Sequence, residues 1–386
     1  MILKDSFLQE LQQLRHELHQ HPEVSGEEQH TAERITSFIK NYDPDEVIDH
    51  IGGYGLAFVF NGSAAGPTLT FRAELDALPI HEINEVPHRS LYENKGHKCG
   101  HDGHMIMVAA LAKLLHDNRP AKGRVILLFQ PAEETGQGAR WMLNDPKYNL
   151  IEPDFIFALH NLPGYPENQI ILKEGTFAAA SKGLIIELIG KTSHAAEPQN
   201  GNSPLRAMSE LQLFLNELTL HTENLQNFCL ATVVHSRLGE RAFGTTPGKA
   251  EVMTTIRAYE DSDLAKMEAT AVAFANELGK MYGLKVNISD TESFSSTLND
   301  KKAVDMITEA SVLVSNDMVT KEEPFRWSED FGLFTQSCKG ALFGLGAGVN
   351  TPDLHNPDYD FPDEITATGV AVFYNIINNL LNKADA

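Results

Sequence analysis

The run Arg124-Val125-Ile126-Leu127-Leu128-Phe129 is followed at once by Gln130-Pro131-Ala132-Glu133-Glu134. An apolar run of this length predicts a buried β-strand. The run Phe155-Ile156-Phe157-Ala158-Leu159 has the same character and leads into His160. Such runs alternate with helical patterns, which predicts an α/β layer with a largely parallel sheet. Polar side chains directly after these strands lie where open α/β sheets bind ligands.

Further elements of the same layer are expected on both sides of this stretch. Strands are predicted at 56–60, 68–72 and 340–346, and helices at 6–20, 28–40 and 104–116. Ser6 is expected to cap the first helix at its N-terminus. His16, His19 and His21 are expected at the surface or the end of that helix, and not as ligands.

Residues 183–292 follow a different pattern. Strands are predicted at 183–189, 230–235, 250–257 and 285–288, and helices at 203–219 and 263–282. This strand-helix-strand-strand-helix-strand order is typical of a ferredoxin-like α+β domain. A chain of 386 residues suits two domains. We therefore predict a discontinuous α/β domain of residues 1–182 and 293–386, with the ferredoxin-like domain inserted at 183–292.

Composition and charge exclude several classes of partner. The formal net charge of −22 argues against nucleic acid and anionic membrane surfaces, because both repel an acidic protein. Three cysteines are too few for a disulfide framework and fit a reducing compartment. The first residues lack a signal-peptide pattern, and no apolar run approaches membrane-spanning length. We therefore expect a cytoplasmic protein.

The run Cys99-Gly100-His101-Asp102-Gly103-His104 gathers a thiol, two imidazoles and a carboxylate within six residues. Thiolate and imidazole groups suit zinc-like divalent metals, so we predict that Cys99 and His101 are ligands. A buried thiol that binds no metal is the alternative for Cys99. For His104, a role in capping or packing the helix is equally open.

Four further side chains complete a candidate metal centre: Glu133, Glu134, His160 and His355. Adjacent carboxylates after a buried strand suggest a division of labour, in which one binds metal and the other takes a proton from bound water. A structural role is the alternative for His160, and a loop position is the alternative for His355. Together, the residues point to metal-assisted hydrolysis and not to a structural metal site.

An ordered set of motifs over nearly the full length resembles a known family. The motifs are 15–23 (RHELHQHPE), 71–79 (FRAELDALP), 99–104 (CGHDGH), 130–134 (QPAEE), 190–198 (GKTSHAAEP), 328–331 (SEDF) and 354–357 (LHNP). The chain is similar to the metallopeptidases that include aminoacylases, carboxypeptidase G-type enzymes and peptidase T-like exopeptidases. It most resembles their amidohydrolase branch, which contains indole-acetyl-amino-acid hydrolases, hippurate hydrolases and N-acetyldiaminopimelate deacetylases.

The resemblance implies a zinc-exopeptidase-like catalytic domain and an inserted lid and dimerisation domain. It also implies two divalent ions per subunit, either zinc or manganese, with cobalt and nickel as further candidates. The implied ligands are Cys99, His101, Glu134, His160 and His355. Glu133 would then be the general base and Asp76 an orienting group. In the other branch a metal-binding histidine stands at the position of Glu74, so the Cys99 and His101 pair would replace it here.

The resemblance further implies that His194 of the lid stabilises the oxyanion, often across a dimer interface. Without the resemblance, the loop around His194 could equally be surface only. Gly244 stands where relatives commonly carry an asparagine that helps to hold substrate. Arg257 could bind a substrate carboxylate or form a structural salt bridge.

The expected substrate is an N-acyl amino acid, cleaved to a carboxylate and a free amino acid. A dipeptide is the nearest rival, because the same centre would cut either bond. A relative that binds metal and ligand without catalysis is the third possibility. An intact Glu133 disfavours that possibility, because a pure binding protein needs no base beside its metal.

Overall fold

The computed structural model describes residues 3–314 and 317–382. Contacts between Cα atoms divide the chain into two compact units. The larger unit comprises the described residues up to Phe177, Thr297–Glu323, and those from Asp330 onward. The smaller unit comprises Ala178–Ser296 and Pro324–Glu329. The functions expected of these parts, catalysis for one and a lid and dimer contact for the other, stay predictions.

The larger unit is built on an eight-stranded sheet within the described residues. In spatial order its strands are β1 (Glu46–Ile51), β2 (Gly55–Asn61), β4 (Arg124–Gln130), β3 (Thr68–Glu74), β5 (Phe155–Leu162), β16 (Lys339–Gly346), β6 (Ile170–Leu172) and β15 (Met318–Thr320). The central strands β4, β3, β5 and β16 run parallel to one another. Antiparallel pairing occurs toward the edges, where β1 joins β2, β2 joins β4, and β6 joins β16. The predicted α/β layer is confirmed.

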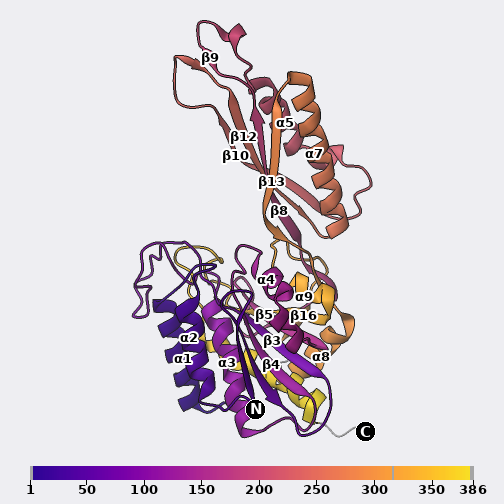
Figure 1. The fold of residues 1–386 in the computed structure, drawn as a ribbon. Helices are drawn as coiled ribbons and strands as arrows, with labels where there is room; N and C mark the ends of the chain where they lie inside the picture. The colour runs from indigo at the N-terminus through magenta and orange to yellow at the C-terminus, as the bar shows by residue number, and fades with distance from the viewer. Residues whose placement is uncertain (1–2, 315–316, 383–386) are drawn as a thin grey trace. The chain divides into compact units, whose positions relative to one another are not determined.

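Helices cover this sheet and share its core (Figure 1). The helices that contribute to the main core are α1 (Asp5–Gln20), α2 (Gln29–Lys40), α3 (His101–Asp117), α8 (Lys301–Val312) and α10 (Thr366–Ile377). Two shorter helices, α4 (Gly138–Asn144) and α9 (Gly332–Ser337), contact β4 and β16 respectively. Strand β5 is buried along its whole length, which explains why it is a continuous apolar run and not an alternating one.

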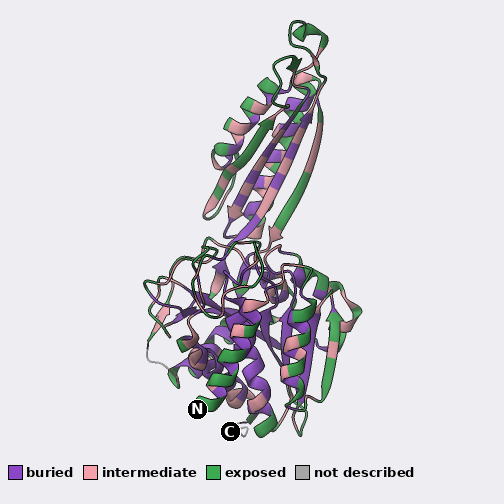
Figure 2. Cartoon of the chain, turned by 90° about the vertical axis from the view of Figure 1, so that its left-hand side faces the viewer, coloured by how far each residue is buried: buried purple, intermediate pink, exposed green. Residues whose placement is uncertain are grey.

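Helix α3 is buried over most of its length, and Figure 2 shows many buried residues in the sheet and helices of the larger unit. The helix starts at His101, three residues before the predicted start at His104. Gly100 precedes it with a φ of 91°, a conformation that glycine adopts without steric cost. A Cβ atom on Gly100 would also lie 2.5 Å from Oδ1 of Asn161. His101 and Asp102 are therefore fixed in the first turn of a buried helix.

Three local expectations were wrong. Helix α1 begins at Asp5 after Lys4, which makes no side-chain capping bond, so Ser6 lies inside the helix and does not cap it. His19 is completely buried and not at the surface. Strand β5 continues to Leu162, so His160 lies within the strand and not after its end.

The smaller unit contains a four-stranded antiparallel sheet in the order β10 (Cys229–Leu238), β12 (Lys249–Ala258), β8 (Ala180–Ile189) and β13 (Lys285–Phe294). Its main helices are α5 (Leu205–Asn216) and α7 (Asp261–Tyr282), and their apolar faces form a separate core with the sheet. Helix α5 follows β8 and α7 follows β12, so the elements have the predicted ferredoxin-like order. Among the described residues, none of the helices in either unit is both long and apolar enough to cross a membrane.

Candidate metal centre

The candidate ligands of the larger unit meet at the carboxyl ends of its parallel strands. Asp76 follows β3, the Glu133 and Glu134 pair follows β4, His160 lies near the end of β5, and His355 follows β16. Parallel strands place their carboxyl ends at one edge of the sheet, which is why segments so far apart in sequence converge.

Three groups of these side chains have ligand atoms within 4.8 Å of one another: Cys99 with His101 and His160, Cys99 with Glu134 and His355, and His101 with Glu133 and Glu134. The structure therefore brings together all five predicted ligands and the predicted base.

The distances between these atoms suit side chains that share an ion. Sγ of Cys99 lies 3.5 Å from Nε2 of His160. Nε2 of His101 lies 3.7 Å from Oε2 of Glu133 and 3.8 Å from Oε1 of Glu134. Nε2 of His355 lies 3.5 Å from the other oxygen of Glu134. Atoms that each lie about 2.0–2.3 Å from one metal are separated by gaps of this size.

Asp76 fixes the direction of His101. Nδ1 of His101 donates a hydrogen bond of 2.8 Å to the backbone oxygen of Asp76, which leaves Nε2 to face the carboxylates. Nε2 is buried and has no hydrogen-bond partner among the described residues. A buried imidazole nitrogen held in this way is typical of a metal ligand whose other nitrogen is oriented by the protein. The residues present therefore fit a divalent metal.

The carboxylate of Asp76 also holds the neighbouring loops in place. Its Oδ2 atom accepts a 2.6 Å hydrogen bond from Oγ of Ser25 and a 3.0 Å bond from the backbone N–H of Glu134. Burial raises the pKa of Asp76, but the contacts with His101, Ser25 and Glu134 outweigh it and keep the pKa below its ordinary value. Asp76 is thus a charged anchor between His101 and Glu134, and its role as an orienting group of a metal site stays a prediction.

The charges of the site call for a cation. Burial and the carboxylates of Glu134 and Glu133 raise the pKa of the Cys99 thiol well above its ordinary value. Burial lowers the pKa of His101, but Asp76, Glu74 and Glu134 outweigh it and raise the pKa to about 10. Four carboxylates and a thiol are therefore gathered around His101 in a buried volume. A bound metal would compensate these negative charges and stabilise the thiolate.

Glu133 and Glu134 both face His101 because the loop before them turns sharply. Ala132 has a φ of 50°, in the left-handed region that residues other than glycine rarely adopt. Its backbone oxygen accepts hydrogen bonds from the N–H groups of Gln137 and Gly138. Adjacent residues in an extended chain would point to opposite sides, and this turn allows both carboxylates to reach the site.

Glu74 lies in a candidate group with His101 and His104, but both of its oxygens are engaged by other side chains. One of its oxygens contacts Arg72, and the other accepts a 2.7 Å hydrogen bond from Nδ1 of His104. Arg72 in turn bonds to Asp330 at 2.9 Å, and these four side chains are buried. His104 is thus a hydrogen-bond partner of Glu74, which favours the packing alternative over a role in metal binding.

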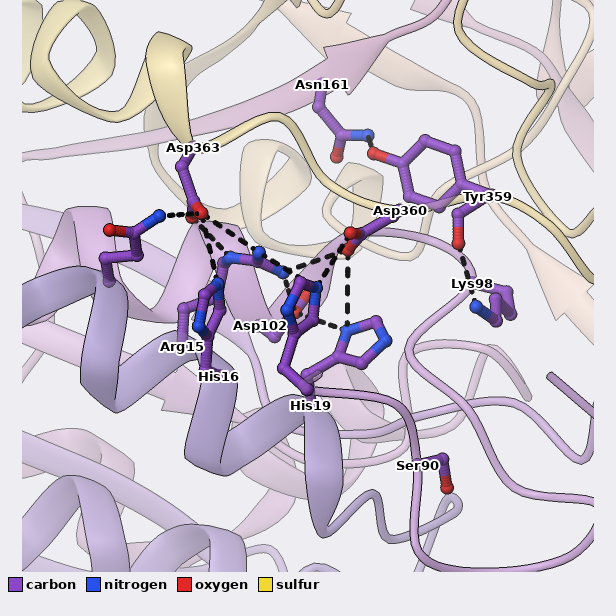
Figure 3. Close-up of polar contacts among 12 residues, drawn as sticks. Arg15, His16, His19, Ser90, Lys98, Asp102, Asn161, Tyr359, Asp360 and Asp363 are labelled. Atoms are coloured by element: carbon purple, nitrogen blue, oxygen red, sulfur yellow. Dashed lines mark hydrogen bonds and ion pairs between the residues drawn. The ribbon is translucent and has the colours of Figure 1, made fainter. Parts of the chain in front are cut away.

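A second buried network lies behind the ligand segment and was missed by sequence reasoning (Figure 3). Arg15 of α1 bonds to Asp102 at 3.0 Å and also contacts Asp360 and Asp363. His19 lies between Asp102, at 2.9 Å, and Glu82, at 3.1 Å. Arg15 and His19 lie four residues apart on the helix face that also buries Leu11 and Leu18. This shared spacing was the available signal that both are buried.

Lys98 connects this network to the ligands. Its side chain is completely buried, and Nζ contacts Oε1 of Glu82 at 2.7 Å and the backbone oxygen of Tyr359 at 2.8 Å. The backbone oxygen of Lys98 accepts a 2.7 Å hydrogen bond from the N–H of His355. Lys98 directly precedes Cys99, so one residue ties the segments of two candidate ligands together.

The remaining predicted site residues belong to the smaller unit. His194 is exposed on the short strand β9 (Ser193–His194), which pairs with β11 (Thr245–Thr246). Gly244 accepts a backbone hydrogen bond from Ala195, and no atom lies near the position of a Cβ on Gly244. Arg257 of β12 donates to the backbone oxygen of Arg326 and to Oγ of Ser328. The roles of His194 and Arg257 at the metal centre stay predictions.

Known proteins share both the sequence pattern and the fold of this chain. The pattern of peptidase family M20/M25/M40 matches residues 70–379. Hippurate hydrolase of Campylobacter jejuni is 29% identical over 366 residues, which cover 94% of each chain.

Two solved structures extend the comparison. The YXEP protein of Bacillus subtilis, described as a dinuclear metal-binding peptidase of the M20 family, has a TM-score of 0.82, with 25% identity over 99% of this chain and 100% of that one. An aminobenzoyl-glutamate utilization protein from Klebsiella pneumoniae has a TM-score of 0.74 at 18% identity, over 98% of each chain, which is a likeness of fold.

Proposed function

This chain belongs to peptidase family M20/M25/M40, and on that premise we propose that it is a metal-dependent amidohydrolase that cleaves N-acyl amino acids to a carboxylate and a free amino acid. The observation that carries the proposal is the pair of adjacent carboxylates, Glu133 and Glu134, that both approach Nε2 of His101. A base beside a metal ligand is the arrangement that metal-assisted hydrolysis requires.

We assign two divalent ions to the ligands Cys99, His101, Glu134, His160 and His355. When bound, such ions polarise a scissile carbonyl and lower the pKa of a water molecule toward neutrality. Glu134 is the better ligand of the carboxylate pair, because one of its oxygens faces His101 and the other faces His355. Its backbone is also held by Asp76. Zinc is favoured by the thiol of Cys99, while manganese is compatible with the carboxylates.

Glu133 is assigned as the general base. Its side chain is 7% exposed and one oxygen faces His101, so it lies beside the ligands and still reaches solvent. We propose that Glu133 accepts the proton of the attacking water and passes it to the nitrogen of the leaving amino acid. The same carboxylate then serves both halves of the reaction, as base and as acid.

Residues of the smaller unit would complete the site. We propose that His194 donates a hydrogen bond to the developing oxyanion, and that the protein is a homodimer through this unit. Arg257 is proposed to bind the substrate carboxylate. Only its Nη1 atom has a hydrogen-bond partner among the described residues, so the guanidinium retains donors for an anion. We also propose a cytoplasmic location, on the sparse cysteines.

The similarity to hippurate hydrolase favours an acyl amino acid over a dipeptide as the substrate. The test is a panel of N-acetyl and N-benzoyl amino acids beside matched dipeptides, with protein loaded separately with zinc and manganese. We expect the wild type to release free amino acid from the acylated substrates, and Glu133→Gln to release it at least about 100-fold more slowly. If the protein cleaves only the dipeptides, its substrate is a dipeptide and not an N-acyl amino acid. A fully metal-loaded protein that cleaves neither class would contradict the proposed activity.

A further inference from the structure

We infer that Glu28 is a positioning residue for the general base, and that it acts through the backbone of Ala132. The inference rests on the proposed role of Glu133. Glu28 is absent from every group of described residues whose ligand atoms lie within 4.8 Å of one another. Its contribution would therefore differ in kind from that of a metal ligand or of a residue that touches substrate.

The carboxyl group of Glu28 joins two loops that are far apart in sequence. Glu28 precedes helix α2 and is completely buried. Its Oε1 atom accepts a 2.8 Å hydrogen bond from the N–H of Gly26 and a 2.9 Å bond from the N–H of Ala132. Ala132 is the residue directly before Glu133. The side chain of Glu28 thus holds the peptide group from which the base extends.

The turn at Ala132 needs such support. A left-handed conformation is unfavourable for an alanine, and Ala132 has a φ of 50°. Its oxygen is held by Gly138 at 3.0 Å, while its N–H is held by Glu28. Loss of the Glu28 bond would leave a buried N–H without its acceptor and would allow the strained turn to relax. Glu133 would then lose its alignment.

The loop that carries Glu28 is itself anchored at the site. Val24 forms an isolated bridge with Ala77, and the N–H of Ala77 donates to the oxygen of Glu23 at 2.8 Å. Oγ of Ser25 donates to the carboxylate of Asp76. These contacts fix the backbone on which Glu28 stands, so its carboxyl group presents a rigid acceptor to Ala132.

A neutral carboxyl group suits this position. Burial and the nearby charge of Asp76 raise the pKa of Glu28 to about 7. Oε2 is buried and has no hydrogen-bond partner among the described residues. Because Oε1 accepts both hydrogen bonds, a glutamine would reproduce the accepting atom and the shape of the side chain. A methionine would keep the length and remove the acceptor.

The test compares three variants of the metal-loaded protein: Glu28→Gln, Glu28→Met and Glu23→Met. Glu23 is the matched control, because its carboxylate lies in the same loop but bonds to Thr31, at 2.7 and 2.9 Å, and not to Ala132. The measurements are metal content, kcat and KM on an N-acyl amino acid, and hydrogen exchange of the peptide that contains Ala132.

We expect Glu28→Met to lower kcat by roughly 10- to 100-fold, with KM and metal content unchanged and faster exchange at Ala132. Glu28→Gln should keep kcat within about threefold, because the acceptor is preserved. Glu23→Met should leave both kcat and the exchange at Ala132 as in the wild type.

Several results would overturn the inference. The first is that Glu28→Met keeps the kcat of the wild type and its hydrogen exchange at Ala132. The second is that Glu23→Met lowers kcat as much as Glu28→Met does. The third is that Glu28→Met loses metal. If Glu28→Met does not fold, the glutamine variant decides, since a folded Glu28→Gln with a 100-fold lower kcat excludes the acceptor role. If the wild type cleaves no substrate, the proposed function fails, but the exchange at Ala132 still decides whether Glu28 orders the turn.

Discussion

Glu74 and His104 are joined by a 2.7 Å hydrogen bond between Oε2 and Nδ1, and both side chains are buried. The other oxygen of Glu74 contacts Arg72. Both oxygens are thus engaged within the protein. The family resemblance implies that the other branch carries a metal-binding histidine at this position, where this chain has Glu74. We propose that the thiol of Cys99 and the imidazoles of His101, His160 and His355 supply the softer donors of the centre.

Cys99→Ala is therefore expected to lower metal occupancy sharply. Cys99 takes part in two of the candidate ligand groups, one with His101 and His160 and one with Glu134 and His355. Elemental analysis of the purified variant would measure the loss. Cys338→Ala is the control, because Cys338 is in none of the groups. Full occupancy in Cys99→Ala would exclude the thiol as a ligand.

Glu133→Gln is expected to retain metal and lower turnover by roughly 10²- to 10⁴-fold, the range typical of a lost general base. The amide keeps the shape of the side chain but cannot accept the proton. Steady-state kinetics with parallel metal analysis would check both parts. Wild-type turnover in this variant would refute the assignment of the base.

His194→Ala is expected to lower turnover by roughly 10²- to 10³-fold, as for the loss of an oxyanion donor. Metal content should not change, because His194 is not assigned as a ligand. His235→Ala provides a control on an exposed histidine of the same unit. An unchanged rate in His194→Ala would place this residue outside the catalytic site.

Arg72→Met is expected to destabilise the fold by about 3–5 kcal/mol, because it leaves the buried carboxylates of Glu74 and Asp330 without their cation. Lys113→Met removes an exposed pair with Asp117 on α3 and should change stability by less than about 1 kcal/mol. Denaturant unfolding of the two variants would give the comparison. Equal unfolding midpoints for the two variants would show that the ion pairs of Arg72 with Glu74 and Asp330 do not stabilise the fold.

His19 predicts a specific pH dependence of stability. Burial lowers the pKa of His19, but hydrogen bonds to Asp102 and Glu82 outweigh it and raise the pKa from 6.5 to about 9. A raised pKa in the folded state stabilises the protein below pH 6.5, and this stability is lost as the pH rises to about 9.

The loss is on the order of 3 kcal/mol at about 1.4 kcal/mol per pKa unit. Unfolding midpoints of the wild type should therefore fall more steeply across this range than those of His19→Gln. Parallel curves for the two proteins would show that His19 does not carry a proton in the folded state. His30→Gln, at an exposed position on α2, controls for the substitution itself.

The elements that could be predicted from sequence are those with local causes. The apolar run before Glu133 is a buried strand because it is apolar on both faces, and the ligands follow such strands because parallel strands end together. The earlier start of α3 depends on Gly100, which has a left-handed conformation and is closely approached by Asn161. That contact spans distant segments and leaves no local pattern.

The buried charged side chains are the main feature that could not be predicted from the sequence. Arg15 and His19 are stabilised by Asp102, Glu82 and Asp360, which come from three other segments. A charged residue on a helix indicates solvent exposure unless its partners are known. The same holds for Glu28, whose hydrogen-bond partner Ala132 lies 104 residues away.

The pairing of β5 with β16 has a consequence for biosynthesis. These neighbouring strands comprise residues 155–162 and 339–346, whereas the strands of the four-stranded sheet in the smaller unit all lie within residues 180–294. A nascent chain therefore exposes a complete set of strands for the inserted unit well before the larger sheet can close. Until β16 leaves the ribosome, β5 retains an apolar, unpaired edge of the kind that promotes aggregation. The larger unit, whose chain is interrupted by the smaller one, is therefore the unit that would depend on chaperones during translation.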